Sequence, residues 1–200
     1  MPSKKANKET IKYGDRLLLL NQHPIPDNST TAGYLDTWGF DKKYGDNEKS
    51  YGVRTSQDPD RDRSSGTWLL VASDGNSDQL KYGHKLRLSK YQYYGDGQVA
   101  GYLEAFEKGG EIHVCASQQA TSQTWQIESN IIKDNEDFVQ NGDRVKLVQQ
   151  FYSTGGGNKS VYLDAKKSPE TDVADTYLVK TSQEANDGSK TWQIIRRSSW

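Results

Sequence analysis

The sequence has little of what many proteins use to close a fold or to cross a membrane. Its 200 residues include a single cysteine, Cys115, which excludes an internal disulfide framework. Only 32% of the residues are hydrophobic, and the longest leucine run, "LLLL" at 17–20, is strand-sized. A membrane-spanning helix needs about 20 consecutive apolar residues, so no membrane span is predicted. No segment keeps a sustained 3.6-residue apolar period, which argues against packed helices.

Charge of either sign is not in excess. The 26 basic residues nearly balance the 27 acidic ones, so nothing in the overall charge attracts nucleic acid or an anionic membrane surface. A nucleic-acid partner is therefore not expected. The amino-terminal stretch "MPSKKANKET" lacks the apolar core of a secretory signal. We therefore expect a cytoplasmic location, with non-classical export as the alternative.

Four short phrases recur three times in the same order. Each unit opens on a turn glycine followed by alternating apolar residues, in "YGDRLLL", "YGHKLRL" and "NGDRVKL" at Gly14, Gly83 and Gly142. A Tyr-Leu phrase follows, in "GYLD", "GYLE" and "VYLD" at Tyr34, Tyr102 and Tyr162. The third phrase ends in Ser-Gln, in "RTSQ", "CASQ" and "KTSQ" at Gln57, Gln118 and Gln183. Each unit closes on a Thr-Trp segment with Trp68, Trp125 or Trp192. Repetition of this kind is typical of a shared scaffold with variable loops.

All four phrases are typical of β-strands. They are short, alternating, rich in Val, Ile, Thr, Tyr and Trp, and bounded by Gly, Asn, Asp and Ser clusters. Four strands in each of three units predict an all-β domain of twelve strands over residues 11–200, after an amino-terminal tail at 1–10. The predicted units cover about 11–78, 79–137 and 138–197.

An all-β chain with threefold repetition and a closing Trp strand resembles the β-trefoil. The rhythm of turn glycine, Tyr-Leu and closing Trp is similar to MIR and fascin-type trefoils, and "SQTWQI" at 122–127 is similar to the Gln-x-Trp ending of ricin-B lectins. The resemblance implies a β-trefoil with three four-stranded repeats. Since one unit cannot bury its apolar face alone, the three must share a core. The predicted core is Leu17, Leu19, Leu35, Val53, Trp68, Leu70, Leu86, Leu88, Leu103, Val114, Trp125, Ile127, Val145, Leu147, Leu163, Val179, Trp192 and Ile194.

The carboxylate after each Tyr-Leu is the main candidate for function. Successive side chains of a strand point to opposite faces, so residues flanking an inward Leu should face solvent. An aromatic ring can stack on a sugar while a neighbouring carboxylate accepts hydrogen bonds from its hydroxyls. The Tyr-Leu-Asp phrase also resembles the Cys-Leu-Asp of ricin-B lectins, whose Asp binds sugar. The predicted outward ligand-binding residues are Tyr34, Asp36 and Trp38, Tyr102, Glu104 and Phe106, and Tyr162 and Asp164. The structural alternative is that each Tyr packs on a neighbouring strand and each acid is merely solvated.

The other motifs give weaker indications of a metal-binding or catalytic site. The stretch "DPDRDRSSG" at 58–66 begins like a calcium loop, but Arg63 stands where that loop requires glycine and Leu69 where it requires glutamate. The three histidines match no metal-binding spacing. Cys115 is expected on the outward side of its strand. No catalytic triad order, paired catalytic carboxylates or cofactor fingerprint is found.

We therefore predict a non-enzymatic recognition module without a cofactor or metal. Carbohydrate or a glycoprotein is the first predicted partner. The alternative is a protein partner, bound through the long loops of the first unit at 21–33 and 39–52, because long loops on a rigid scaffold often carry function.

Overall fold

The structure, a computed structural model, consists of β-strands and one short 3-10 helix. It describes residues 9–24, 31–40, 50–62, 64–73, 78–93, 99–108, 110–118, 124–131, 137–153, 157–166, 177–183 and 188–198. The strands are β1 (Arg16–Pro24), β2 (Thr31–Phe40), β3 (Ser50–Ser56), β4 (Trp68–Ala72), β5 (Lys85–Tyr93), β6 (Val99–Lys108), β7 (Glu111–Ser117), β8 (Trp125–Ser129), β9 (Arg144–Ser153), β10 (Gly157–Lys166), β11 (Leu178–Ser182) and β12 (Trp192–Arg196). The helix η1 (Gly188–Lys190) lies directly before β12. The predicted all-β class is confirmed.

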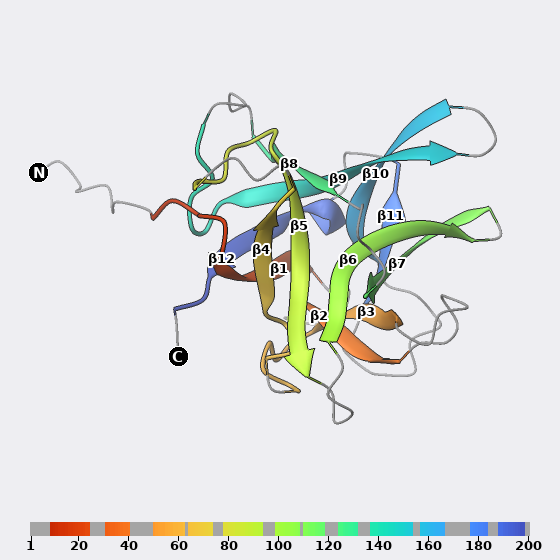
Figure 1. Cartoon of the computed structure of the whole chain (residues 1–200), viewed down its shortest axis with the longest axis horizontal. Helices are drawn as coiled ribbons and strands as arrows, with labels where there is room; N and C mark the ends of the chain where they lie inside the picture. Colours follow the sequence, from red (N-terminus) through yellow and green to blue (C-terminus); the bar gives the residue numbers. More distant parts are fainter. Residues whose placement is uncertain are drawn as a thin grey trace, which may run out of the picture.

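Six of the strands close a ring. Antiparallel pairs join β1 to β4, β4 to β5, β5 to β8, β8 to β9, β9 to β12 and β12 back to β1. The other six strands form the pairs β2–β3, β6–β7 and β10–β11, which continue from β1, β5 and β9 (Figure 1). Strand β3 also pairs with β7 and with β11, which brings the three strand pairs together at one end of the ring.

The core lies inside this ring and under the strand pairs. All eighteen residues predicted for the core are buried. The tryptophans Trp68, Trp125 and Trp192 are fully buried, and each indole nitrogen has a backbone acceptor. At 3.0 Å in each case, Nε1 donates to the carbonyl of Leu35, Leu103 and Leu163 respectively. Each closing strand is thereby tied to the strand that carries a Tyr-Leu phrase.

Two glycines in these Tyr-Leu strands permit a close approach of a second backbone. Gly33 and Gly101 have φ values of 98° and 88°, in the left-handed region. A Cβ atom on Gly33 would lie 2.5 Å from the carbonyl oxygen of Ser56, and one on Gly101 would lie 2.1 Å from that of Ser117. The third Tyr-Leu phrase has Val161 at this position. Its side chain excludes the same close approach between β10 and β11.

Gly101→Ala is expected to destabilise the fold far more than Gly110→Ala. Both glycines have a positive φ, 88° and 82°, so both variants carry the strain of about 1–3 kcal/mol that this conformation costs. Only the Gly101 variant also forces the backbone of Ser117 to move, because a Cβ on Gly110 would meet nothing within 4 Å. Urea unfolding of both variants checks the difference. Equal losses would show that backbone strain alone acts at Gly101.

The outward placement predicted for Cys115 is wrong. The thiol is buried, with 1% of the residue exposed. It belongs to a run of four consecutive buried residues of β7, at 114–117, so this part of the strand has no solvent face. Its neighbour β3 pairs with β7 at Gly52 and Cys115, and Sγ lies 3.5 Å from a carboxylate oxygen of Glu104. In the part of the chain that the structure describes, no helix has the length and apolar character to cross a membrane.

Candidate functional site

Two of the three repeated carboxylates, Asp36 and Asp164, do not face solvent as predicted. Asp36 has no exposed surface and Asp164 is 2% exposed, so the expected outward orientation is wrong for both. Asp36 forms an ion pair with Arg61, whose Nε donates a hydrogen bond to Oδ2 of Asp36 at 3.1 Å. The same guanidinium donates to the backbone carbonyl of Thr37 at 3.0 Å. The segment that carries Arg61 therefore covers the second face of β2.

The equivalent residues of the other two phrases have different partners. Asp164 lies 4.0 Å from the ammonium of Lys190 in η1, and both side chains are buried. Glu104 is half-buried and accepts a hydrogen bond from Cys115. Each carboxylate thus has a partner within the protein, and that partner differs from one phrase to the next.

Burial is the main influence on the pKa of two of these carboxylates. The pKa of Asp36 is raised by loss of solvent, which outweighs the lowering by the Ser65 hydroxyl and by Arg61. The pKa of Glu104 is likewise raised by burial, against hydrogen bonds from Cys115 and Ser117. A sugar at the outer surface would reach Asp36 or Asp164 only after displacing a cation or a covering segment. The sugar-binding role of these residues remains a prediction.

The aromatic residues predicted beside the carboxylates are half-buried, and most of their faces have a neighbour. The guanidinium of Arg61 lies 3.8 Å from the centre of the Trp38 ring, close enough for a cation–π contact. Similar contacts bring Arg87 to 5.0 Å from Tyr102 and Lys146 to 5.9 Å from Tyr162, while His113 lies 5.7 Å from Phe106. Tyr34 is also half-buried. These contacts agree with the part of the structural alternative in which the rings pack on neighbouring residues, but two of the three acids are not solvated as that alternative supposed.

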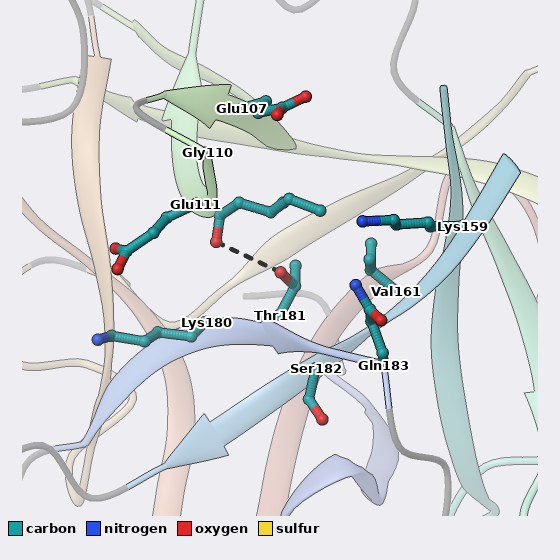
Figure 2. A pocket seen from close by; sticks show the side chains of 10 residues that line it. Glu107, Gly110, Glu111, Lys159, Val161, Lys180, Thr181, Ser182 and Gln183 are labelled. Atoms are coloured by element: carbon teal, nitrogen blue, oxygen red, sulfur yellow. Dashed lines mark hydrogen bonds between the residues drawn. The ribbon is translucent and has the colours of Figure 1, made fainter. Parts of the chain in front are cut away.

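A pocket of about 320 Å³ opens where β7, β10 and β11 meet (Figure 2). This volume lies at the lower end of the range of about 300–1,000 Å³ for small-molecule sites. Its lining combines both charges, an amide and hydroxyls over two aliphatic side chains: Glu107, Glu111, Lys159, Lys180, Gln183, Thr181 and Ser182 with Ile112 and Val161, beside Gly110. The site therefore offers donors and acceptors around a small apolar floor.

The pocket lies at a gap between two strands. Strand β3 pairs with both β7 and β11, but among the described strands no ladder joins β7 to β11. Instead the hydroxyl of Thr181 donates to the backbone carbonyl of Ile112 at 3.3 Å, the bond drawn in Figure 2. The two strand edges are held together by a side chain, which leaves space beside them.

The third unit differs in sequence from the first beside this pocket. In the first unit Gln57 donates to the carbonyl of Thr31 at 2.6 Å, next to the close approach at Gly33. In the third unit Val161 occupies the position of that glycine, and Gln183 lines the pocket instead. Val161 and Gln183 therefore both contribute side chains to the pocket lining.

None of the pocket residues was predicted from the sequence. The available signal was the change from glycine to Val161 in the third Tyr-Leu phrase, which distinguishes that phrase from the other two. In the residues that the structure describes, no group of three or more His, Cys, Asp or Glu side chains is placed to hold a metal ion.

Comparison with known proteins identifies the fold. No model of a known protein family matches the chain, and no curated protein sequence matches it. Among solved structures, the SDF2-like protein from Arabidopsis thaliana superposes with a TM-score of 0.63 at 17% identity, over 94% of this chain and 95% of that one. Soybean trypsin inhibitor (Kunitz) gives a TM-score of 0.61 at 12% identity, over 95% of each chain.

A third neighbour is much longer than this chain. The Saccharomyces cerevisiae protein O-mannosyltransferase Pmt1-Pmt2 complex, bound to the sugar donor, gives a TM-score of 0.59 at 16% identity. The match covers 98% of this chain but 27% of that one. Identities this low carry information about the fold alone. Together with the closed ring and its three attached strand pairs, these neighbours show that the chain has an all-β fold of the β-trefoil kind.

Proposed function

We propose that the protein is a non-enzymatic recognition module that binds carbohydrate in the pocket between β7, β10 and β11. The observation that carries this proposal is a pocket in which four of the polar side chains are not used in bonds within the described part of the protein. Among the described residues, the side chains of Glu107, Lys159, Lys180 and Gln183 have no hydrogen-bond or ion-pair partner. Sugar hydroxyls both donate and accept, so they match a site that mixes amines, carboxylates and an amide.

The known neighbours are compatible with this proposal. The SDF2-like protein and the trypsin inhibitor support a binding module, and the mannosyltransferase complex was solved with a sugar donor bound. That complex is an enzyme several times longer than this chain, so its chemistry is not transferred. The pocket carries the argument for carbohydrate.

We also infer that the strands are three copies of one four-stranded unit, within the limits 11–78, 79–137 and 138–197. The three indole-to-carbonyl bonds of equal length support this inference. If the units are copies, the pocket belongs to the third of them, where Val161 replaces glycine. One ligand site in each chain, rather than three, is the consequence.

A glycan array tests the proposed function. Wild-type protein is expected to bind a subset of glycans, and the double variant Gln183→Ala/Lys180→Ala is expected to lose about tenfold or more in affinity, since each lost hydrogen bond costs about 0.5–1.5 kcal/mol. Gln126→Ala, a change on β8 outside the pocket lining, is the matched control and should bind as wild type. No binding of any glycan by a folded wild-type protein would overturn the carbohydrate proposal.

A protein partner is the second candidate, favoured by the superposition on a trypsin inhibitor. This function would use the loops predicted from the sequence, of which 25–30 and 41–49 lie outside the described residues. Replacing 41–49 with a Gly-Ser linker separates the two functions. Loss of trypsin inhibition or of another protein contact, with glycan binding unchanged, would assign protein recognition to these loops.

A further inference from the structure

We propose that the pocket selects an anionic saccharide, one whose sugar ring carries a carboxylate, and that Lys159 and Lys180 recognise this charge. The inference rests on the proposed function and specifies the class of sugar. It is carried by two cations that reach one pocket from two adjacent strands without a partner in the described part of the protein.

The two lysines of this pocket differ from Arg61 and Lys190 because their side chains have no carboxylate partner among the described residues. Arg61 is bound to Asp36, and Lys190 lies beside Asp164, so these cations already neutralise buried carboxylates. Lys159 and Lys180 are both exposed, and neither forms an ion pair with a described residue. Both ammonium groups belong to the lining of one pocket, and each would attract a ligand that brings a negative charge.

The pocket also has an orientation. In Figure 2 the side chains of Lys159 and Gln183 point into the pocket, while the carboxylates of Glu107 and Glu111 point away from its centre. Glu111 lies 4.0 Å from the ring of His113. We infer that the ligand's carboxylate lies beside Lys159 and the amide of Gln183, where like charge does not oppose it.

The remaining lining suits the rest of a sugar ring. Val161 and the half-buried Ile112 form aliphatic surface, which can contact the C–H face of a pyranose. Glu107 and Glu111 are exposed at the opposite side, and rotation of their side chains toward the pocket would let them accept hydrogen bonds from neutral hydroxyl groups there. A ligand with charge at one end and hydroxyls at the other therefore matches both sides of the pocket.

The test compares two oligosaccharides that differ only at one terminal carbon, one ending in glucuronic acid and one in glucose. Isothermal titration calorimetry on the full chain at ~20 mM and ~300 mM salt gives both affinities and their dependence on screening. Wild-type protein is expected to bind the acidic oligosaccharide about tenfold more tightly at low salt, because charge-assisted bonds are roughly twice as strong as neutral ones. This preference should shrink at high salt.

The variant Lys159→Gln removes the charge but keeps a donor. It should abolish the preference for the acidic oligosaccharide and leave binding of the neutral one unchanged, and Lys180→Gln should reduce the preference in the same direction. Lys85→Gln, at an exposed lysine of β5 outside the pocket lining, is the matched control and should behave as wild type. Circular dichroism confirms that each variant is folded.

The possible results separate failure of the charge selection from failure of the proposed carbohydrate binding. Equal wild-type affinity for the acidic and neutral oligosaccharides would overturn the charge selection and leave the carbohydrate proposal intact. A preference that survives in Lys159→Gln and Lys180→Gln would overturn the assignment of these two residues. No binding of either oligosaccharide, together with no binding on the glycan array, would overturn both proposals. A sulfated oligosaccharide bound in preference to the glucuronate would overturn the choice of carboxylate.

Discussion

Replacing Trp125 with alanine is expected to lower the free energy of unfolding by about 3–5 kcal/mol. The side chain has no exposed surface, so its removal leaves a cavity in the core where the ring strands β5 and β8 pair. The substitution also removes the donor to the carbonyl of Leu103, which is then left without this 3.0 Å bond. An unsatisfied buried acceptor costs about 1–3 kcal/mol by itself, a cost included in the total.

Two further variants separate these causes. Trp125→Phe fills most of the space but cannot donate, so we expect about 1–3 kcal/mol, the cost of the unsatisfied carbonyl. Gln126→Ala changes the next residue of the same strand, whose side chain is half-buried, and should cost within about 0.5 kcal/mol. Guanidinium unfolding measures all three. A cost for Trp125→Ala no larger than that of Gln126→Ala would contradict the central place of this tryptophan in the core.

Local alternation was enough to predict this core. The side chains of Trp125 and Ile127 point to the same face of β8. A short strand with one apolar face is stable only when that face packs against the core. The same reasoning holds for each unit, because the ring strands keep one face inside and one outside. The repeated tryptophans therefore carried most of the information about the fold.

The alternation rule failed where both faces of a strand are covered. Leu35, Asp36 and Thr37 are consecutive and have no exposed surface, so β2 has no solvent face at this point. The covering contact comes from Arg61, in the stretch at 58–66 whose likeness to a calcium loop gave no indication of a contact with β2. Nothing local to Asp36 signals this contact, and the carboxylate was therefore predicted to point outward.

The pocket was hidden from the sequence for a related reason. Val161 in place of glycine indicates that the third Tyr-Leu phrase differs, but not that a ligand site results. The placement of Lys159 and Lys180 around one space depends on the register of β10 against β9 and β11, and on the position of β7. Such a site is assembled by tertiary contacts between residues that share no pattern.

Lys90 is expected to make the stability of the protein rise with pH above neutrality. Its side chain has no exposed surface, and Nζ donates to the carbonyls of Ser64 at 2.8 Å and Thr67 at 2.7 Å. Burial lowers the pKa of this amine to about 7, with the charge of Arg197 acting in the same direction and those of Asp36 and Asp60 opposing it. A neutral amine has two N–H groups, which is the number of carbonyls that it faces.

The sign of the effect follows from proton binding. In the unfolded chain the amine titrates near its ordinary pKa of about 10.4, so between pH ~7 and ~10 the unfolded state binds more protons than the folded one. The free energy of unfolding therefore increases with pH across this window, by at most about 1.4 kcal/mol for each pH unit. Below the folded pKa the penalty for a buried ammonium is fully present, and Asp36 and Asp60 offset only part of it.

Urea unfolding at pH 6, 7, 8 and 9 isolates this contribution by difference. Lys90→Met keeps the buried volume and removes the titration, so the free energy of unfolding of wild type minus that of Lys90→Met should rise by about 2–3 kcal/mol between pH 7 and pH 9. Lys85→Met, at an exposed position of the same strand, should leave the pH dependence of wild type unchanged. A constant difference between wild type and Lys90→Met would mean that Lys90 keeps its proton throughout this range. The buried ammonium would then be held by Asp36 and Asp60 rather than by the two carbonyls alone.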